Sequence, residues 1–140
     1  MQSTVARIPE PVPADEKSLA EVIRRPRRRQ CPLPDERALE LCDGMIDIAA
    51  ALFNVPGKEL REPGKTGLQV SRVRQIAMYV AHVALRLRMR DIGHGFGRDR
   101  TTVVYACHLV EDMRDDEDFD RIVAMTERVA LAAFSNRHGL

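Results

Sequence analysis

The stretch IGHGFGRDRTTVVYAC, Ile92 to Cys107, decides the fold because it combines glycines that favour a turn with apolar residues at helical spacing. Three glycines stand at alternate positions and are followed by the polar run from Arg98 to Thr102. Apolar residues then recur every three or four positions, beginning with Val103 and Ala106. This order predicts a short helix, a tight turn and a second helix, which is the pattern of a helix-turn-helix.

The turn is expected to leave the start of the second helix exposed. Ile92, Phe96, Val103 and Ala106 would anchor the two helices to the core. At the exposed start, backbone N–H groups and the positive end of the helix dipole favour phosphate, and short polar side chains can reach base edges. The residues predicted to lie there are Arg98, Asp99, Arg100, Thr101 and Thr102.

Composition favours an all-α protein with a single domain. The chain has 140 residues, only 4% of them aromatic and none of them Trp. A core of this size must therefore be built from Ala, Leu, Ile, Val and Met, which suits helices better than a β-sandwich.

Residues 1–34 are predicted to be a disordered basic arm, with the folded domain over 35–140. The arm holds most of the prolines and the run RRPRRR at Arg24–Arg29, and it has too few large apolar residues to offset the entropy of ordering. Two interpretations of the run remain open: a solvated charge run, or a flexible arm that binds phosphates or the minor groove.

Charge is distributed unevenly along a chain whose net charge is only +1. Residues 58–100 hold ten Lys or Arg against four acids, a net +6, whereas residues 101–140 are acidic. No apolar run is long enough for a membrane helix or a signal sequence, so we expect a cytoplasmic, nucleoid-associated protein without membrane contact. The three cysteines form no CxxC pair and the histidines lack metal spacing, so neither a disulfide nor a metal site is expected.

Apolar periodicity predicts the remaining helices. Asp35 can cap a helix that ends at residues 55–57, and residues 58–70 form a loop with or without a short helical turn at its start. A long helix is predicted over residues 71–89, and a closing helix over residues 119–133. The spacing also places Leu52, Val83 and Ile122 on buried faces.

No catalytic or nucleotide-binding motif is found. The GKT at Gly64–Thr66 is not a phosphate loop, because Glu59 stands where that motif needs glycine and no apolar strand precedes it. The carboxylates of residues 111–120 are better explained as a solvated, DNA-averse surface than as a nuclease centre. We therefore expect no enzyme activity, no cofactor and no bound nucleotide.

The motif IGHGFG-RD-RTTVVYAC, together with RQIAMY at Arg74–Tyr79, resembles the C-terminal duplex-DNA-binding domain of the bacterial replication initiator DnaA. The resemblance runs from about Ala38 to about Val129. It implies an all-helical, TrpR-like domain that recognises a short asymmetric DnaA box in the major groove, with a basic loop in the neighbouring minor groove. Without a Walker A motif, the chain looks like a stand-alone copy of that domain that binds double-stranded DNA without ATP.

The resemblance also assigns residues. Asp99, Thr101 and Thr102 match positions that contact bases or adjacent phosphates, and Arg74 and Gln75 match positions that hold the DNA backbone. Two departures stand out: Gly97 is single where the family has two glycines, and Arg100 replaces a histidine. The basic loop is also weaker than in the family and offers only Arg61, Lys65 and Arg72. The predicted DNA-binding residues are Lys65, Arg72, Arg74, Gln75, Arg98, Asp99, Arg100, Thr101 and Thr102.

Alternatives remain at two levels. Asp99 can be read as an N-cap alone, and Thr101 and Thr102 as ordinary first-turn residues. For the whole chain, a sequence-specific regulator of transcription or replication stands against a protein-interaction module with a decayed helix-turn-helix. The sequence does not choose between a monomer and a homodimer.

Overall fold

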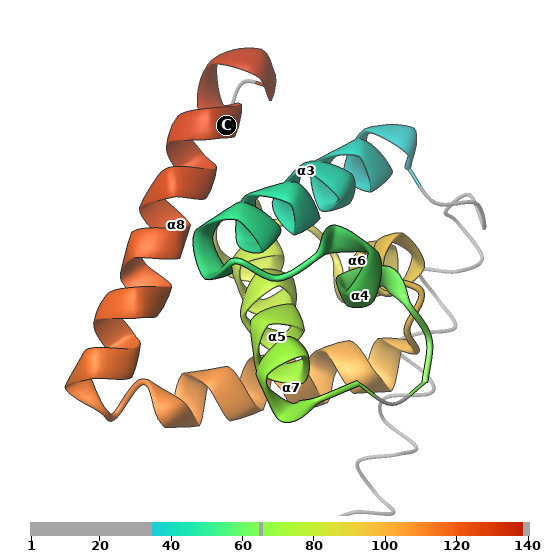
Figure 1. Cartoon of the computed structure of the whole chain (residues 1–140). Coiled ribbons are helices and arrows are strands. Elements are labelled where there is room, and N and C mark those ends of the chain that lie inside the picture. The colour runs from blue at the N-terminus through green and yellow to red at the C-terminus, as the bar shows by residue number, and fades with distance from the viewer. Residues whose placement is uncertain (1–34, 65, 139–140) are drawn as a thin grey trace, which may run out of the picture. The chain divides into compact units, whose positions relative to one another are not determined.

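A computed structural model describes residues 35–64 and 66–138, and every regular element in these ranges is a helix (Figure 1). The helices are α3 Glu36–Phe53, α4 Gly57–Arg61, α5 Leu68–Val83, α6 Met89–Phe96, α7 Arg100–Met113 and α8 Glu117–His138. The predicted all-α fold is therefore confirmed for these residues. The predicted arm over residues 1–34, as well as Lys65, lies outside the described residues.

Helix α3 begins and ends where the sequence predicts. The Asp35 carboxylate accepts a hydrogen bond from the backbone N–H of Arg37 at 3.1 Å, which satisfies one of the free donors at the start of the helix. Asn54 ends the helix in the left-handed conformation, and Pro56 follows shortly after it. One face is buried as far as the last turn, through Ala38, Leu41, Cys42, Met45, Ile46 and Ala49.

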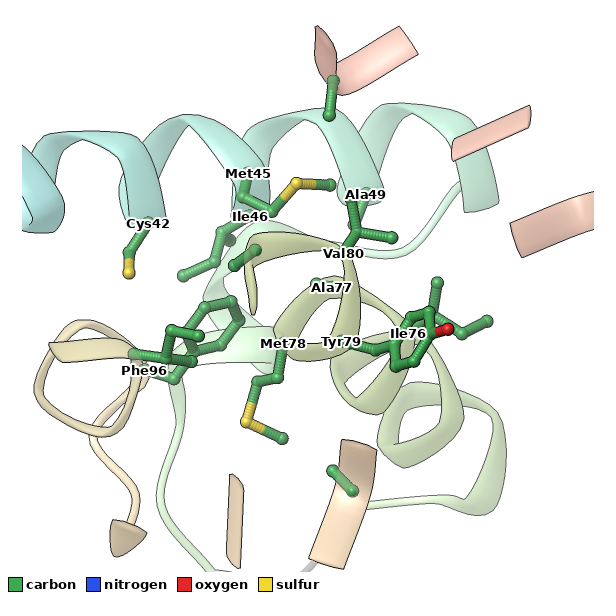
Figure 2. Packing of buried hydrophobic residues seen from close by; sticks show 14 of the residues in the cluster. Cys42, Met45, Ile46, Ala49, Ile76, Ala77, Met78, Tyr79, Val80 and Phe96 are labelled. Carbon is green, nitrogen blue, oxygen red and sulfur yellow. The ribbon is translucent and has the colours of Figure 1, made fainter. Parts of the chain in front are cut away.

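Helix α5 is the centre of the core, because it is covered by neighbours on nearly every side. From Val73 to Ala81 every residue except Gln75 is buried. Figure 2 shows Met45 and Ala49 of α3 over the face of α5 that carries Val80. The part of the helix from Ile76 to Ala81 carries apolar and aromatic side chains on every side, so it has no polar stripe to present to water and needs such a central place.

The end of α5 differs from the prediction of a helix over residues 71–89. The helix stops earlier, because Arg86 takes the left-handed conformation with φ 62. The N–H of Leu87 then donates to the carbonyl of Ala81 at 3.1 Å, which closes the turn at the end of the helix. The turn buries Leu85, which is 2% exposed. Packing therefore ends this helix, with no glycine or proline in the sequence to mark the stop.

Three apolar residues that were predicted to be buried lie at the surface instead: Leu52, Val83 and Ile122 are 36%, 45% and 40% exposed. The first two stand in the last turns of α3 and α5. In α8 the buried face lies one position further along the chain, through Val123, Thr126, Ala130 and Phe134. Spacing alone could not separate these two neighbouring faces.

One arginine makes hydrogen bonds that hold helix α8 to the rest of the domain. Arg114, which follows α7, donates to the carboxylates of Asp120 and Glu127 and to the Tyr79 hydroxyl of α5. Burial alone would lower the pKa of Arg114, but the hydrogen bonds to Asp120, Tyr79 and Glu127 outweigh it and raise that pKa. The charged side chain therefore belongs to the packing between α5, α7 and α8.

Candidate nucleic-acid interface

The predicted helix-turn-helix is made of α6 and α7, which are joined by Gly97, Arg98 and Asp99. Gly97 ends α6 in the left-handed conformation with φ 67, which glycine adopts without steric cost. The N–H of Arg98 then donates to the carbonyl of Gly93 at 2.8 Å. A Cβ atom at residue 93 would lie 2.7 Å from the carbonyl oxygen of Arg98, so the turn closes only over glycine. The glycines therefore fix the direction in which α7 leaves α6.

Helix α7 has one buried face and one exposed face. Val103, Ala106, Cys107 and Val110 are at most 5% exposed and hold the helix in the core. Arg100, Thr101 and Thr102 are exposed, and together with Asp99 they form what we call the recognition surface. The structure thus brings together the residues of the predicted binding end of this helix.

Asp99 is the N-cap residue of α7 by backbone position, but its side chain makes no capping hydrogen bond. Its carbonyl accepts the first helical bond, from the N–H of Val103 at 3.2 Å, while its carboxylate is exposed. The N–H groups of the first helical turn have no partner further back in an α-helix, and the helix dipole adds positive potential there. Capping therefore does not account for the aspartate side chain, and the end of the helix is left open to an acceptor.

Two predicted contact residues, Arg74 and Arg98, are turned toward the protein. Arg74 is only 6% exposed, and its guanidinium donates to the carbonyls of Leu60 and Glu59, both at 3.0 Å. Arg98 donates to the carbonyl of Glu62 at 2.7 Å. No local pattern indicates these partners, because they lie far away along the chain. A contact between Arg74 and a phosphate would need the guanidinium at the surface, whereas the structure buries it.

Two further cations of the predicted basic loop, Arg72 and Arg61, occupy different settings. Arg72 donates to the side-chain oxygen of Gln75 at 2.8 Å, so these two predicted residues form one pair on α5. Arg61 lies 3.5 Å and 3.7 Å from the carboxylates of Asp43 and Asp47 on α3, which partly neutralise it. Arg72 therefore stands next to the loop with an uncharged partner, whereas Arg61 is paired with carboxylates.

Tyr105 is a further candidate contact residue, which is not among the predicted DNA-binding residues. It lies on α7 one turn beyond Thr101 and Thr102, and it is 63% exposed. A phenol ring exposed to this extent beside a polar surface can pack against a sugar or donate a hydrogen bond to a phosphate. The signal was present in the i+4 spacing from Thr101.

The segment around GKT has a structural role in the described residues. Glu59 lies within the short helix α4, and the Thr66 hydroxyl bonds to Arg74 and Ser71. Within residues 35–64 and 66–138, no group of three His, Cys, Asp or Glu side chains is arranged to hold a metal ion. In the same ranges no helix is long and apolar enough to span a membrane.

Comparison with known proteins agrees with this geometry. Residues 42–110 match the family described as the bacterial DnaA protein helix-turn-helix, a range that holds α6, the turn and most of α7. The chain is also 38% identical over 117 residues to the chromosomal replication initiator protein DnaA of Mycobacteroides abscessus. Residues 42–110 are a DnaA-type helix-turn-helix.

The similarity to DnaA covers 81% of this chain but only 23% of the Mycobacteroides protein, so the chain spans about a quarter of that relative. A solved structure titled as a DNA replication initiation factor superposes with a TM-score of 0.64 at 21% identity, covering 94% of this chain and 38% of the other. At that identity the structural match supports the fold alone. It agrees with the helix-turn-helix fold that α6 and α7 form here.

The two departures from the DnaA pattern fall in the same turn. Gly97 alone makes the left-handed bend, and the chain closes back onto Gly93 without a second glycine. Arg100 is the first residue of α7 and is exposed. A longer, permanently charged side chain thus stands at the start of the helix, where the DnaA pattern has histidine.

Proposed function

We propose that this chain binds duplex DNA in a sequence-specific manner, with the recognition surface in the major groove. The observation that carries the proposal is the start of α7. Its polar residues are exposed and the Asp99 side chain makes no capping hydrogen bond, while the opposite face of the helix is packed in the core. Since an α-helix fits the major groove, such a rigid helix end can bring side chains against base edges.

Each part of the recognition surface has a suitable partner on DNA. Arg100 can donate two parallel hydrogen bonds to the O6 and N7 atoms of a guanine, and the Asp99 carboxylate can accept from the amino group of a cytosine. Thr101 and Thr102 offer a methyl group to thymine and a hydroxyl to a base edge or a phosphate. The free N–H groups of the first turn suit a phosphate oxygen.

A second contact is proposed for the loop over residues 62–67 and for Arg72, which follows it at the start of α5. Residues 58–100 carry a net charge of +6, so this part of the domain attracts the phosphate backbone. We assign the loop and Arg72 to the neighbouring minor groove. Arg74 supports the loop from within, as its burial indicates.

We infer that the chain acts by occupying its site, as a regulator of transcription or replication found on the nucleoid. Binding is proposed to need no ATP and no cofactor, because the GKT at Gly64–Thr66 lacks the glycine and the preceding strand of a phosphate loop. The competing function from the sequence, a protein-interaction module, differs in a measurable way. Displacing counterions from DNA makes affinity fall steeply with salt, by a slope of about 0.9 per phosphate contact.

Selection of bound sequences from random duplex DNA tests the proposal, followed by titrations at several salt concentrations. The natural protein should enrich one motif, and Thr101→Ala with Thr102→Ala should lose roughly 1–3 kcal/mol of preference for it while keeping its helix content. Ser135→Ala is the matched control, because it removes a hydroxyl from α8, whose C-terminal part lies away from the α6–α7 turn (Figure 1). No enriched motif together with salt-independent binding to a protein would favour the interaction module.

A further inference from the structure

The C-terminal end of α4 is capped by two arginines from other elements. The last carbonyls of any helix lack intrahelical partners and carry partial negative charge. Here Arg74 of α5 donates hydrogen bonds to the carbonyls of Glu59 and Leu60. Arg98 of the α6–α7 turn donates to the carbonyl of Glu62, the C-cap residue. A helix of five residues is thus held from two sides.

The two guanidinium groups are neighbours despite their like charge. Burial lowers the pKa of Arg74, and the positive charge of Arg98 lowers it further. Such repulsion is tolerated only where acceptors are concentrated, as they are at a helix C-terminus. The cluster of carbonyls at Glu59, Leu60 and Glu62 supplies those acceptors.

The contact of Arg98 joins two parts of the proposed DNA interface. Glu62 begins the loop that leads to α5, while Arg98 directly precedes the recognition surface, 36 residues later in the chain. Arg98 also donates to the carbonyl of Gly97 at 3.3 Å, so its planar fork lies across the turn and the loop. At the other end of the loop, Thr66 bonds to Arg74 at 3.2 Å.

We propose that Arg98 is a positioning residue that holds the start of the loop between α4 and α5, at Glu62, in one register against the start of α7. The inference rests on the proposed function, since the register matters for reading two neighbouring grooves. With Arg98 in place, the loop and the recognition surface keep a fixed spacing. They then bind only DNA in which the bases contacted by the loop and by α7 are separated by the same spacing. Arg98 thereby contributes specificity without needing to touch a base.

The first experiment measures the register in the absence of DNA, by amide hydrogen exchange followed in peptides over residues 59–67. Arg98→Ala and Arg98→Lys should exchange there about tenfold faster than the natural protein, because a charge-assisted hydrogen bond to the loop is lost. Arg100→Ala is the matched control and should leave these peptides unchanged. Unchanged exchange in both Arg98 variants would overturn the proposal.

The second experiment repeats the selection from random DNA with Arg98→Lys, which keeps the charge but not the planar fork. The positions read by α7 should persist, while preference at the flank read by the loop should weaken by about tenfold. The salt slope should be unchanged. If Arg98 instead binds a phosphate directly, Arg98→Ala lowers affinity for all sequences equally and reduces the slope by about one, with normal exchange.

The two experiments also separate this proposal from the function on which it rests. If the natural protein enriches no DNA motif, the proposed function fails, while the exchange result still reports whether Arg98 holds the loop. If a motif is enriched and Arg98→Lys keeps the same preference as the natural protein at the flank contacted by the loop, the proposed function stands and the positioning role of Arg98 is overturned.

Discussion

Gly95 of α6 lies directly against Cys42 of α3, so closely that a Cβ atom at residue 95 would stand 2.5 Å from the Cys42 sulfur. The two helices can approach to this distance only because residue 95 has no side chain. The contact holds the first helix of the helix-turn-helix on the core, and with it the direction of α7.

Gly95→Ala should therefore destabilise the domain. Alanine is the better helix former by up to about 1 kcal/mol, but overpacking against Cys42 costs roughly 1–3 kcal/mol and should outweigh it. Urea unfolding measures the difference. Gly57→Ala is the matched control, because the nearest atom to its new Cβ is the mobile end of Arg61, at 3.2 Å. A Gly95 variant as stable as the control would show that α6 can shift without cost.

Arg114→Met should loosen α8 from the domain. The change removes the partner of Glu127, whose side chain is only 19% exposed, and leaves this carboxylate without its cation. We expect a loss of about 1–3 kcal/mol in the free energy of unfolding, measured in urea. Arg121→Ala should cost under about 1 kcal/mol, because it pairs with Asp118 between two exposed side chains. Equal effects from the two substitutions would contradict the role given to Arg114.

Alkaline pH should destabilise the protein through its buried thiols. Burial raises the pKa of Cys42 to about 12, helped by Asp43 and Asp91, and raises the pKa of Cys107 to about 11. Above the ordinary value of 9.0, the unfolded chain releases these protons while the folded protein keeps them. Stability is therefore fully present below pH 9 and falls as pH rises toward 11, by roughly 1 kcal/mol per pH unit for each thiol.

Urea unfolding between pH 8 and pH 10.5 checks this sign. Cys42→Ala with Cys107→Ala should be less stable at pH 8, because both buried sulfurs are lost, but should show a shallower decline with pH. Other groups that titrate in this range, including Cys31, are common to both proteins, so the difference between the two slopes isolates the two thiols. Parallel slopes would mean that the thiols ionise as easily in the folded protein as in the unfolded chain.

Arg100→His should change which DNA sequence is selected. Arginine at the start of α7 suits a guanine through two parallel bonds, whereas histidine is shorter and accepts or donates a single bond. The expected result is the disappearance of one guanine from the selected motif, with a loss of about 1–3 kcal/mol on the original site and the other positions intact. Identical motifs at reduced affinity would instead make Arg100 a contact to the DNA backbone.

Sequence reasoning succeeded where the signal is local. The Asp35 cap, the glycine turn at Gly97 and the buried face of α7 all depend on residues within a few positions of one another. It placed the end of α5 wrongly, because Arg86 adopts the left-handed conformation in a turn that buries Leu85. It also placed Ile122 on the wrong face of α8, since two neighbouring faces of that helix carry similar apolar spacing.

The sequence by itself determined the helical class and the polar, exposed start of α7, because hydrophobic periodicity, glycine and capping residues act over a few positions. Only the tertiary structure decided what the arginines do. Arg61, Arg74, Arg98 and Arg114 look alike in the sequence, yet they pair with acids of α3, cap α4 and hold α8. A long cationic side chain bonds to whichever acceptors packing brings within its reach, and those acceptors come from distant parts of the chain.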